Sequence, residues 1–198
     1  MLNIASNLIR RSGFLLVIGL VLLATAAQAA GDDPAMLVQK MRGELAPAMM
    51  SAMQAGGPES AVGVCKDVAP AVAARLSRES GWQVRRVSLQ PRNPLLGTPD
   101  AWEQEQLLAW QKARAENPKL PPQSLQTTTT EPAGVMQRYL QEIPLAPHCT
   151  ACHGGSADIA PATRERLALE YPHDLATGYA VGDQRGAFAF KRLRAEGE

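Results

Sequence analysis

The residues best suited to chemistry lie together at positions 149–153. Cys149 and Cys152 are separated by two residues, and His153 follows directly. This spacing is typical of haem attachment, because each thiol can add across a haem vinyl group while the adjacent imidazole is held under the iron. The motif occurs once. We therefore predict one covalent haem c, bound through Cys149 and Cys152, with His153 as an iron ligand.

Two cysteines at this spacing can also form a thioredoxin-like redox pair, a structural disulfide or half of a zinc site. A redox pair opens a helix directly after a strand, whereas these cysteines follow Pro144 and Pro147. A closed zinc site needs four ligands, and only Cys65, His148 and His173 remain to complete one. The haem interpretation agrees with both the spacing and the terminal histidine.

Residues 1–29 have the order of a secretory signal peptide. Two arginines precede an apolar run from Phe14 to Leu23, and small residues end at Ala29. The run is shorter than the roughly 17 to 25 residues of a spanning helix. We expect export to the periplasm, cleavage after about Ala29, no membrane span afterwards, and a single domain over residues 30–198.

The charge argues against nucleic acid as a partner. The whole chain has a formal net charge of +1, and removal of Arg10 and Arg11 with the signal peptide lowers it to −1. A near-neutral chain has little electrostatic attraction for nucleic acid.

Hydrophobic spacing and turn residues predict an α+β domain. Helices are expected over about residues 34–53, 58–78, 98–114 and 162–169, and strands over about 82–89, 124–130 and 187–193. Residues 135–140 fit either a strand or a short helix. Pro70 follows Cys65 by five residues, which predicts a kink or a break near the thiol.

Cys65 is the cysteine that the haem motif leaves over. Helical spacing places it on one face with Val68, Ala69, Val72 and Leu76, so its thiol is expected to point inward. A free cysteine is commonly a small buried side chain. The residues alone favour that structural role over iron ligation.

Short motifs surround the haem motif over most of the chain. They are Cys65-Lys66 with Ala69-Pro70, Arg86 with Ser88, Arg92-Asn93-Pro94 before Trp102-Glu103, Tyr171-Pro172 with Asp174 and Ala176 to Tyr179, and Gly182-Asp183 with Arg185-Gly186. In this order they resemble the PAS-like single-haem c-type family, described from a cyanobacterial haem protein with histidine and cysteine axial ligands. The resemblance implies a PAS-like antiparallel sheet flanked by helices.

The resemblance also implies that the iron is held by His153 on one side and Cys65 on the other. An axial thiolate would favour the ferric state and lower the reduction potential. The alternative is a methionine thioether in place of Cys65, which would raise the reduction potential. The candidates are Met41, Met49, Met50, Met53 and Met136. Most of these are expected to be core residues. His173 ranks third, and His148 is poorly placed because it adjoins Cys149.

Arg86 and Arg92 are candidate partners of the haem propionates, since a guanidinium pairs with a carboxylate through two parallel hydrogen bonds. Each fits equally well as a solvated strand arginine or as a partner of Glu103. Trp102 is expected in the core.

Three functions fit one exported haem domain. A change at the iron could displace a weak thiolate, which suits redox or small-ligand sensing by analogy with PAS-like domains. A simple electron carrier is the alternative. An enzyme such as a peroxidase ranks third, because it needs a distal acid–base residue. We predict a haem redox protein rather than an enzyme, with a redox partner protein or a small ligand.

Overall fold

The computed structural model describes residues 33–194. The predicted signal peptide, residues 1–29, lies outside the described residues and stays a prediction. Between residues 33 and 194, no helix combines the length and the apolar character needed to cross a membrane.

Four antiparallel strands form one open sheet in the order β1-β4-β3-β2. Their bounds are β1 Gln83–Val87, β2 Ser124–Glu131, β3 Gly134–Pro144 and β4 Gln184–Leu193. The predicted α+β class and antiparallel sheet are confirmed. Residues 135–140, which fitted either a strand or a short helix, lie within β3. Pairing with β2 on one edge and with β4 on the other holds this segment as a strand.

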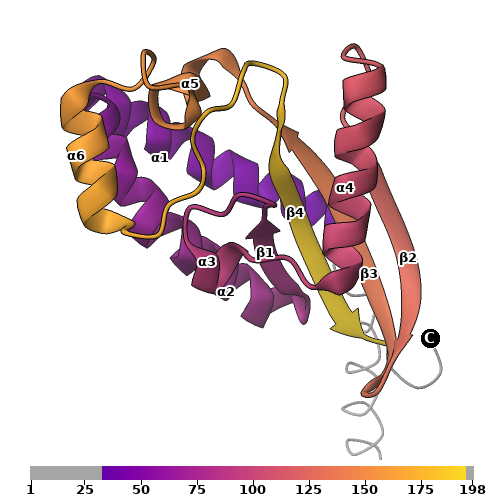
Figure 1. Ribbon diagram of the computed structural model, residues 1–198. Coiled ribbons are helices and arrows are strands. Elements are labelled where there is room, and N and C mark those ends of the chain that lie inside the picture. The colour runs from indigo at the N-terminus through magenta and orange to yellow at the C-terminus, as the bar shows by residue number, and fades with distance from the viewer. Residues whose placement is uncertain (1–32, 195–198) are drawn as a thin grey trace, which may run out of the picture. The chain divides into compact units, whose positions relative to one another are not determined.

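Side chains alternate between the two faces of β4. Phe188 and Phe190 pack against α1 (Pro34–Gly63) and α2 (Ala69–Ser80), in a core with Leu37 and Leu76. Ala187 and Ala189 pack on the opposite face, where α4 (Ala101–Glu116) contributes Leu107. Helices therefore cover both faces, with α1 and α2 behind the sheet and α4 in front (Figure 1). The small alanines let α4 approach the strand closely.

The helix that carries Cys65 bends as its prolines and glycines predict. Gly56 and Gly57 leave helical geometry, and Gly57 has a φ of 71° that favours glycine. The chain then continues into a π-helical turn, η2 (Val64–Val68), before α2. The kink predicted from Pro70 is thus accommodated by a wider turn rather than by a break.

One part of the predicted inward face is wrong. Ala69, Val72 and Leu76 are buried, but Val68 is 38% exposed. The π turn inserts an extra residue, which rotates the positions before it relative to those after it.

Three short helices complete the described fold: α3 (Pro94–Gly97), η3 (Pro147–Cys149) and α5 (Thr150–His153). Sequence spacing does not predict α3, because a helix of four residues is too short to show a helical period. The longer α6 (Pro161–Glu170) agrees with the predicted helix.

Ion pairs fasten α4 to the sheet. Arg85 of β1 bonds Glu103 at 2.7 Å, and Arg114 bonds Glu142 of β3 at 2.7 Å. Asp100 caps the helix by accepting from the Glu103 amide, while the Glu103 side chain accepts from the Asp100 amide. Glu103 is therefore the partner of Arg85, not of Arg86 or Arg92.

Replacing Glu142 with Gln should destabilise the protein by about 3 kcal/mol. The carboxylate has no exposed surface and also accepts a bond from the Gln123 amide, so its loss leaves Arg114 buried without its counter-charge. Urea unfolding measures the difference. The control is Arg75→Gln, which removes exposed ion pairs with Glu44 and Glu79 and should cost much less stability than Glu142→Gln. Equal losses in the two variants would contradict the expectation.

Candidate functional site

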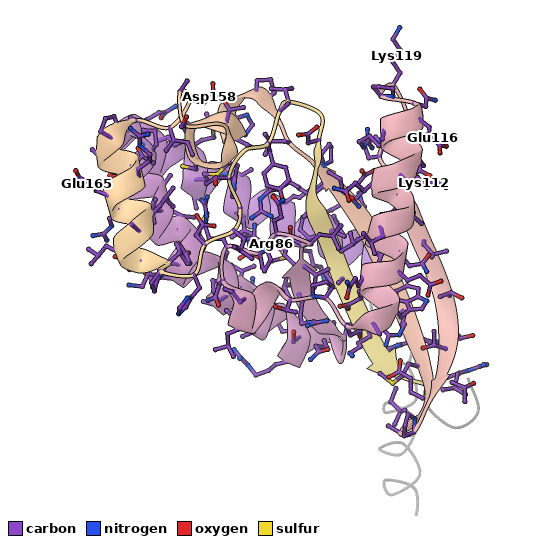
Figure 2. All side chains as sticks on the ribbon, in the orientation of Figure 1. Arg86, Lys112, Glu116, Lys119, Asp158 and Glu165 are labelled. Atoms are coloured by element: carbon purple, nitrogen blue, oxygen red, sulfur yellow. The ribbon has the colours of Figure 1, made fainter. Side chains whose placement is uncertain are left out.

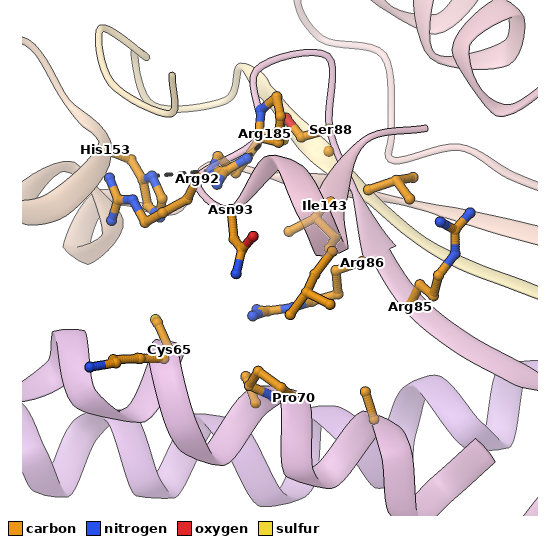
Figure 3. A pocket seen from close by; sticks show the side chains of 18 of the residues that line it. Cys65, Pro70, Arg85, Arg86, Ser88, Arg92, Asn93, Ile143, His153 and Arg185 are labelled. Atoms are coloured by element: carbon orange, nitrogen blue, oxygen red, sulfur yellow. Dashed lines mark hydrogen bonds between the residues drawn. The ribbon is translucent and has the colours of Figure 1, made fainter. Parts of the chain in front are cut away.

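A cavity of about 710 Å³ lies between the sheet and the α1–α2 side. Its lining includes all six residues singled out from the sequence: Cys65, Arg86, Arg92, Cys149, Cys152 and His153. They come from a helix, a strand, a loop and the short helices after β3. Figure 3 shows Cys65 on the helical wall and His153 on the opposite side of the cavity.

The two motif cysteines lie one helical turn apart, at the end of η3 and within α5. Both are free thiols that line the cavity. Burial raises the pKa of the Cys152 thiol, so it is protonated at neutral pH. Among the described residues, no group of three or more His, Cys, Asp or Glu side chains could hold a metal ion.

Cys65 lies in the π-helical turn η2 and faces the cavity. Single π turns are frequent at functional sites because the extra residue redirects a side chain. Lys66 forms an ion pair with Glu170 of α6, which fastens this turn to the neighbouring helix. Tyr171, at the end of α6, is buried on the same cavity wall, and burial raises its pKa to about 12.

The imidazole of His153 is oriented through its Nδ1 atom. This nitrogen lies 2.7 Å from the carbonyl oxygen of Ala176 and 3.1 Å from Nε of Arg185. Burial, followed by the positive charges of Arg185 and Arg92, lowers the pKa of His153 to about 2. The ring is therefore neutral near pH 7, which is the form that ligates metals.

Arg92 holds the haem-motif loop in place. Its Nε donates to Asp174 at 3.1 Å, and its Nη2 donates to the carbonyl oxygens of Cys152 and, at 3.2 Å, of Ala176. The side chain is only 8% exposed. One guanidinium thus joins three segments that are far apart in the sequence.

The cavity lining carries cationic side chains but no acidic ones, and three of its cations pair with carboxylates outside the lining. Its charged residues are Lys66, Arg85, Arg86, Arg92 and Arg185, and no Asp or Glu is among the lining residues. The side chain of Arg86 makes no hydrogen bond or ion pair with another described residue, while its backbone pairs with Phe188 of β4. Figure 2 labels Arg86 near the middle of the view, where its side chain is exposed at the mouth of the cavity, while Lys112 and Glu116 lie on α4 and Lys119 follows the end of that helix. The cavity is suited to an anionic ligand.

The other ligand candidates divide between cavity and surface. Met41, Met49, Met53 and His148 line the cavity, whereas Met50, Met136 and His173 do not. His173 is exposed. Trp102 packs against the α4-side core, as predicted. Sequence reasoning gave no individual role to Arg185 or Tyr171, although both belong to the quoted motifs.

The chain is similar to one known family and to one solved structure. The sequence model of the Tll0287-like family matches residues 22–191. The chain belongs to the Tll0287-like family. The crystal structure of the cyanobacterial haem protein Tll0287 is similar to this Tll0287-like chain, with 27% sequence identity and a TM-score of 0.55. The match covers 84% of this chain and 100% of that one. No curated protein matches the chain.

Replacing Arg92 with Gln should destabilise the protein by about 3 to 5 kcal/mol, because Asp174 loses its buried ion-pair partner and the carbonyl groups of Cys152 and Ala176 each lose one donor. Arg92→Lys should recover only part of the loss, since an ammonium lacks the planar fork. Thermal or urea unfolding measures both variants.

Arg86→Gln is the matched control. It removes the same charge from the same cavity but breaks no described bond, so a change within about 0.5 kcal/mol is expected. If Arg86→Gln lowered the free energy of unfolding as much as Arg92→Gln does, the positive charge of the cavity, rather than the hydrogen bonds of Arg92, would account for the stability of the loop.

Proposed function

We propose that this protein binds one haem c covalently in the cavity, through Cys149 and Cys152, with His153 and Cys65 as the axial ligands of the iron. The observation that carries the proposal is the convergence of these four residues on a single cavity that contains no acidic side chain. The haem-protein relative Tll0287 supports it.

The cavity has the properties that a haem requires. Its volume of about 710 Å³ falls within the usual range of cofactor sites. Apolar residues such as Val62, Ala69 and Ile143 line it. The Arg86 side chain, which forms no hydrogen bond or ion pair within residues 33–194, is available to a propionate. Arg92 already bonds Asp174, so its main role is to hold the loop.

The residues divide the chemistry among them. Cys149 and Cys152 would hold the haem through thioether bonds, each made by adding a thiol S–H across a vinyl group, with sulfur on one vinyl carbon and hydrogen on the other. His153 would ligate the iron through Nε2 while its Nδ1–H donates to the Ala176 carbonyl oxygen. Cys65 would supply a thiolate from the opposite wall. Bound haem supplies a one-electron couple and a site for small ligands.

We propose redox or small-ligand sensing in the periplasm as the role of this site, with a PAS-like domain as the scaffold. The supporting observation is the π turn at Cys65, which lies between α1 and α2. Movement of the thiol on or off the iron would be transmitted directly to both helices. A simple electron carrier, whose ligands stay bound in both oxidation states, is the alternative.

Covalent attachment is tested by mass spectrometry of the denatured, exported protein. The wild type should carry the mass of one haem. The variant with both Cys149→Ala and Cys152→Ala should carry none, because both thioether bonds are lost. Cys65→Ala is the control and should keep the full mass. Haem that dissociates from the denatured wild type would contradict c-type attachment.

Ligation by Cys65 is tested by spectra and potential. Cys65→Ala should lose the thiolate-type ferric absorption bands, and its potential should rise because the electron-donating ligand is gone. Carbon monoxide binding to the reduced wild type would favour sensing, whereas six-coordinate iron in both states would favour an electron carrier. Unchanged spectra would direct the search to Met41, Met49 and Met53, which line the cavity.

A further inference from the structure

Arg185 lies at an irregularity between β3 and β4. Ile143 is opposite Gly186 and Pro144 is opposite Gln184, so Arg185 has no partner in the β3 ladder. Pro144 has no amide to donate, which explains why regular pairing ends there. A β-bulge of this kind redirects a side chain. It brings Arg185 into the cavity lining and against His153 (Figure 3).

Two groups compete for the same nitrogen of His153. Nδ1 lies 2.7 Å from the Ala176 carbonyl oxygen, which can only accept, and 3.1 Å from Arg185 Nε, which can only donate. A neutral imidazole nitrogen is either a donor or an acceptor. Bonding to Ala176 leaves a lone pair on Nε2, whereas bonding to Arg185 places the proton on Nε2. Only the Ala176 arrangement allows Nε2 to bind iron.

Apart from His153, Arg185 contacts only uncharged groups among residues 33–194. Its other contacts are Ser88 Oγ at 3.0 Å, the Gln90 carbonyl oxygen at 3.5 Å and the ring of Tyr179. Among the described residues, no carboxylate forms an ion pair with it, in contrast to Arg85 and Arg92. Burial lowers its pKa to about 10, so the guanidinium remains charged at neutral pH.

We propose that Arg185 is a positioning residue that gives up its hydrogen bond to His153 and binds a carboxylate of the haem instead. His153 Nδ1–H then donates to the Ala176 carbonyl oxygen alone, and Nε2 is available to the iron. This inference rests on the proposed function. It assigns to Arg185 two linked tasks: it neutralises a carboxylate and it releases the imidazole in its ligating form.

The test compares the haem-loaded, full-length wild type with Arg185→Gln and Arg185→Lys. Loss of the positive charge should shift the reduction equilibrium about tenfold toward the ferric form, which is about 59 mV for one electron. Arg185→Lys keeps the charge and should shift the equilibrium less than threefold. Arg75→Gln removes an exposed arginine of α2 that does not line the cavity, and should leave the potential unchanged.

A crystal structure of the haem-loaded wild type provides the second measurement, which does not depend on the folding of any variant. We expect Arg185 to contact a haem carboxylate and His153 Nδ1 to contact Ala176 alone. Arg185 Nε still bonded to Nδ1 would overturn the exchange, as would equal potentials in Arg185→Gln and wild type. A wild type without covalent haem would instead overturn the proposed function itself.

Discussion

The bonds of Arg92 are the interaction on which the site depends. A single buried guanidinium bonds Asp174 and the carbonyl oxygens of Cys152 and Ala176. Ala176 in turn accepts from His153, so the clamp also orients the proposed iron ligand. Because a buried cation must be paired, this network makes the loop geometry and the stability of the fold interdependent.

The charges on the two sides of the sheet serve different purposes. On the α4 side, Arg85 and Arg114 are each matched by a buried glutamate, and these pairs position a helix. On the cavity side, Arg86 and Arg185 have no described carboxylate partner. Arg86 is exposed and Arg185 is partly buried, so both guanidinium groups are available to an anion that binds in the cavity. This imbalance is a property of a binding site rather than of a structural core.

Two local irregularities bring the proposed ligands into the same space. A π turn carries Cys65, and a bulge carries Arg185 to His153. Gly186 makes the second possible, since a Cβ there would lie 2.2 Å from the Val87 carbonyl oxygen of the neighbouring strand. Each irregularity departs from a regular period by one residue, and each places a reactive or charged side chain on the cavity wall.

The sequence by itself determined the local elements and the haem motif. Hydrophobic spacing predicted a helix over about residues 98–114, where most of α4 lies, and the Cys149 to His153 spacing indicated haem attachment. The order of the motifs pointed to Cys65 as a candidate iron ligand, but it did not predict the π turn that carries this residue. Only the tertiary structure decided that Arg92 holds a loop, that Val68 is exposed and that Arg185 reaches His153. Those outcomes depend on contacts between distant segments and on single-residue shifts in register, which local spacing does not encode.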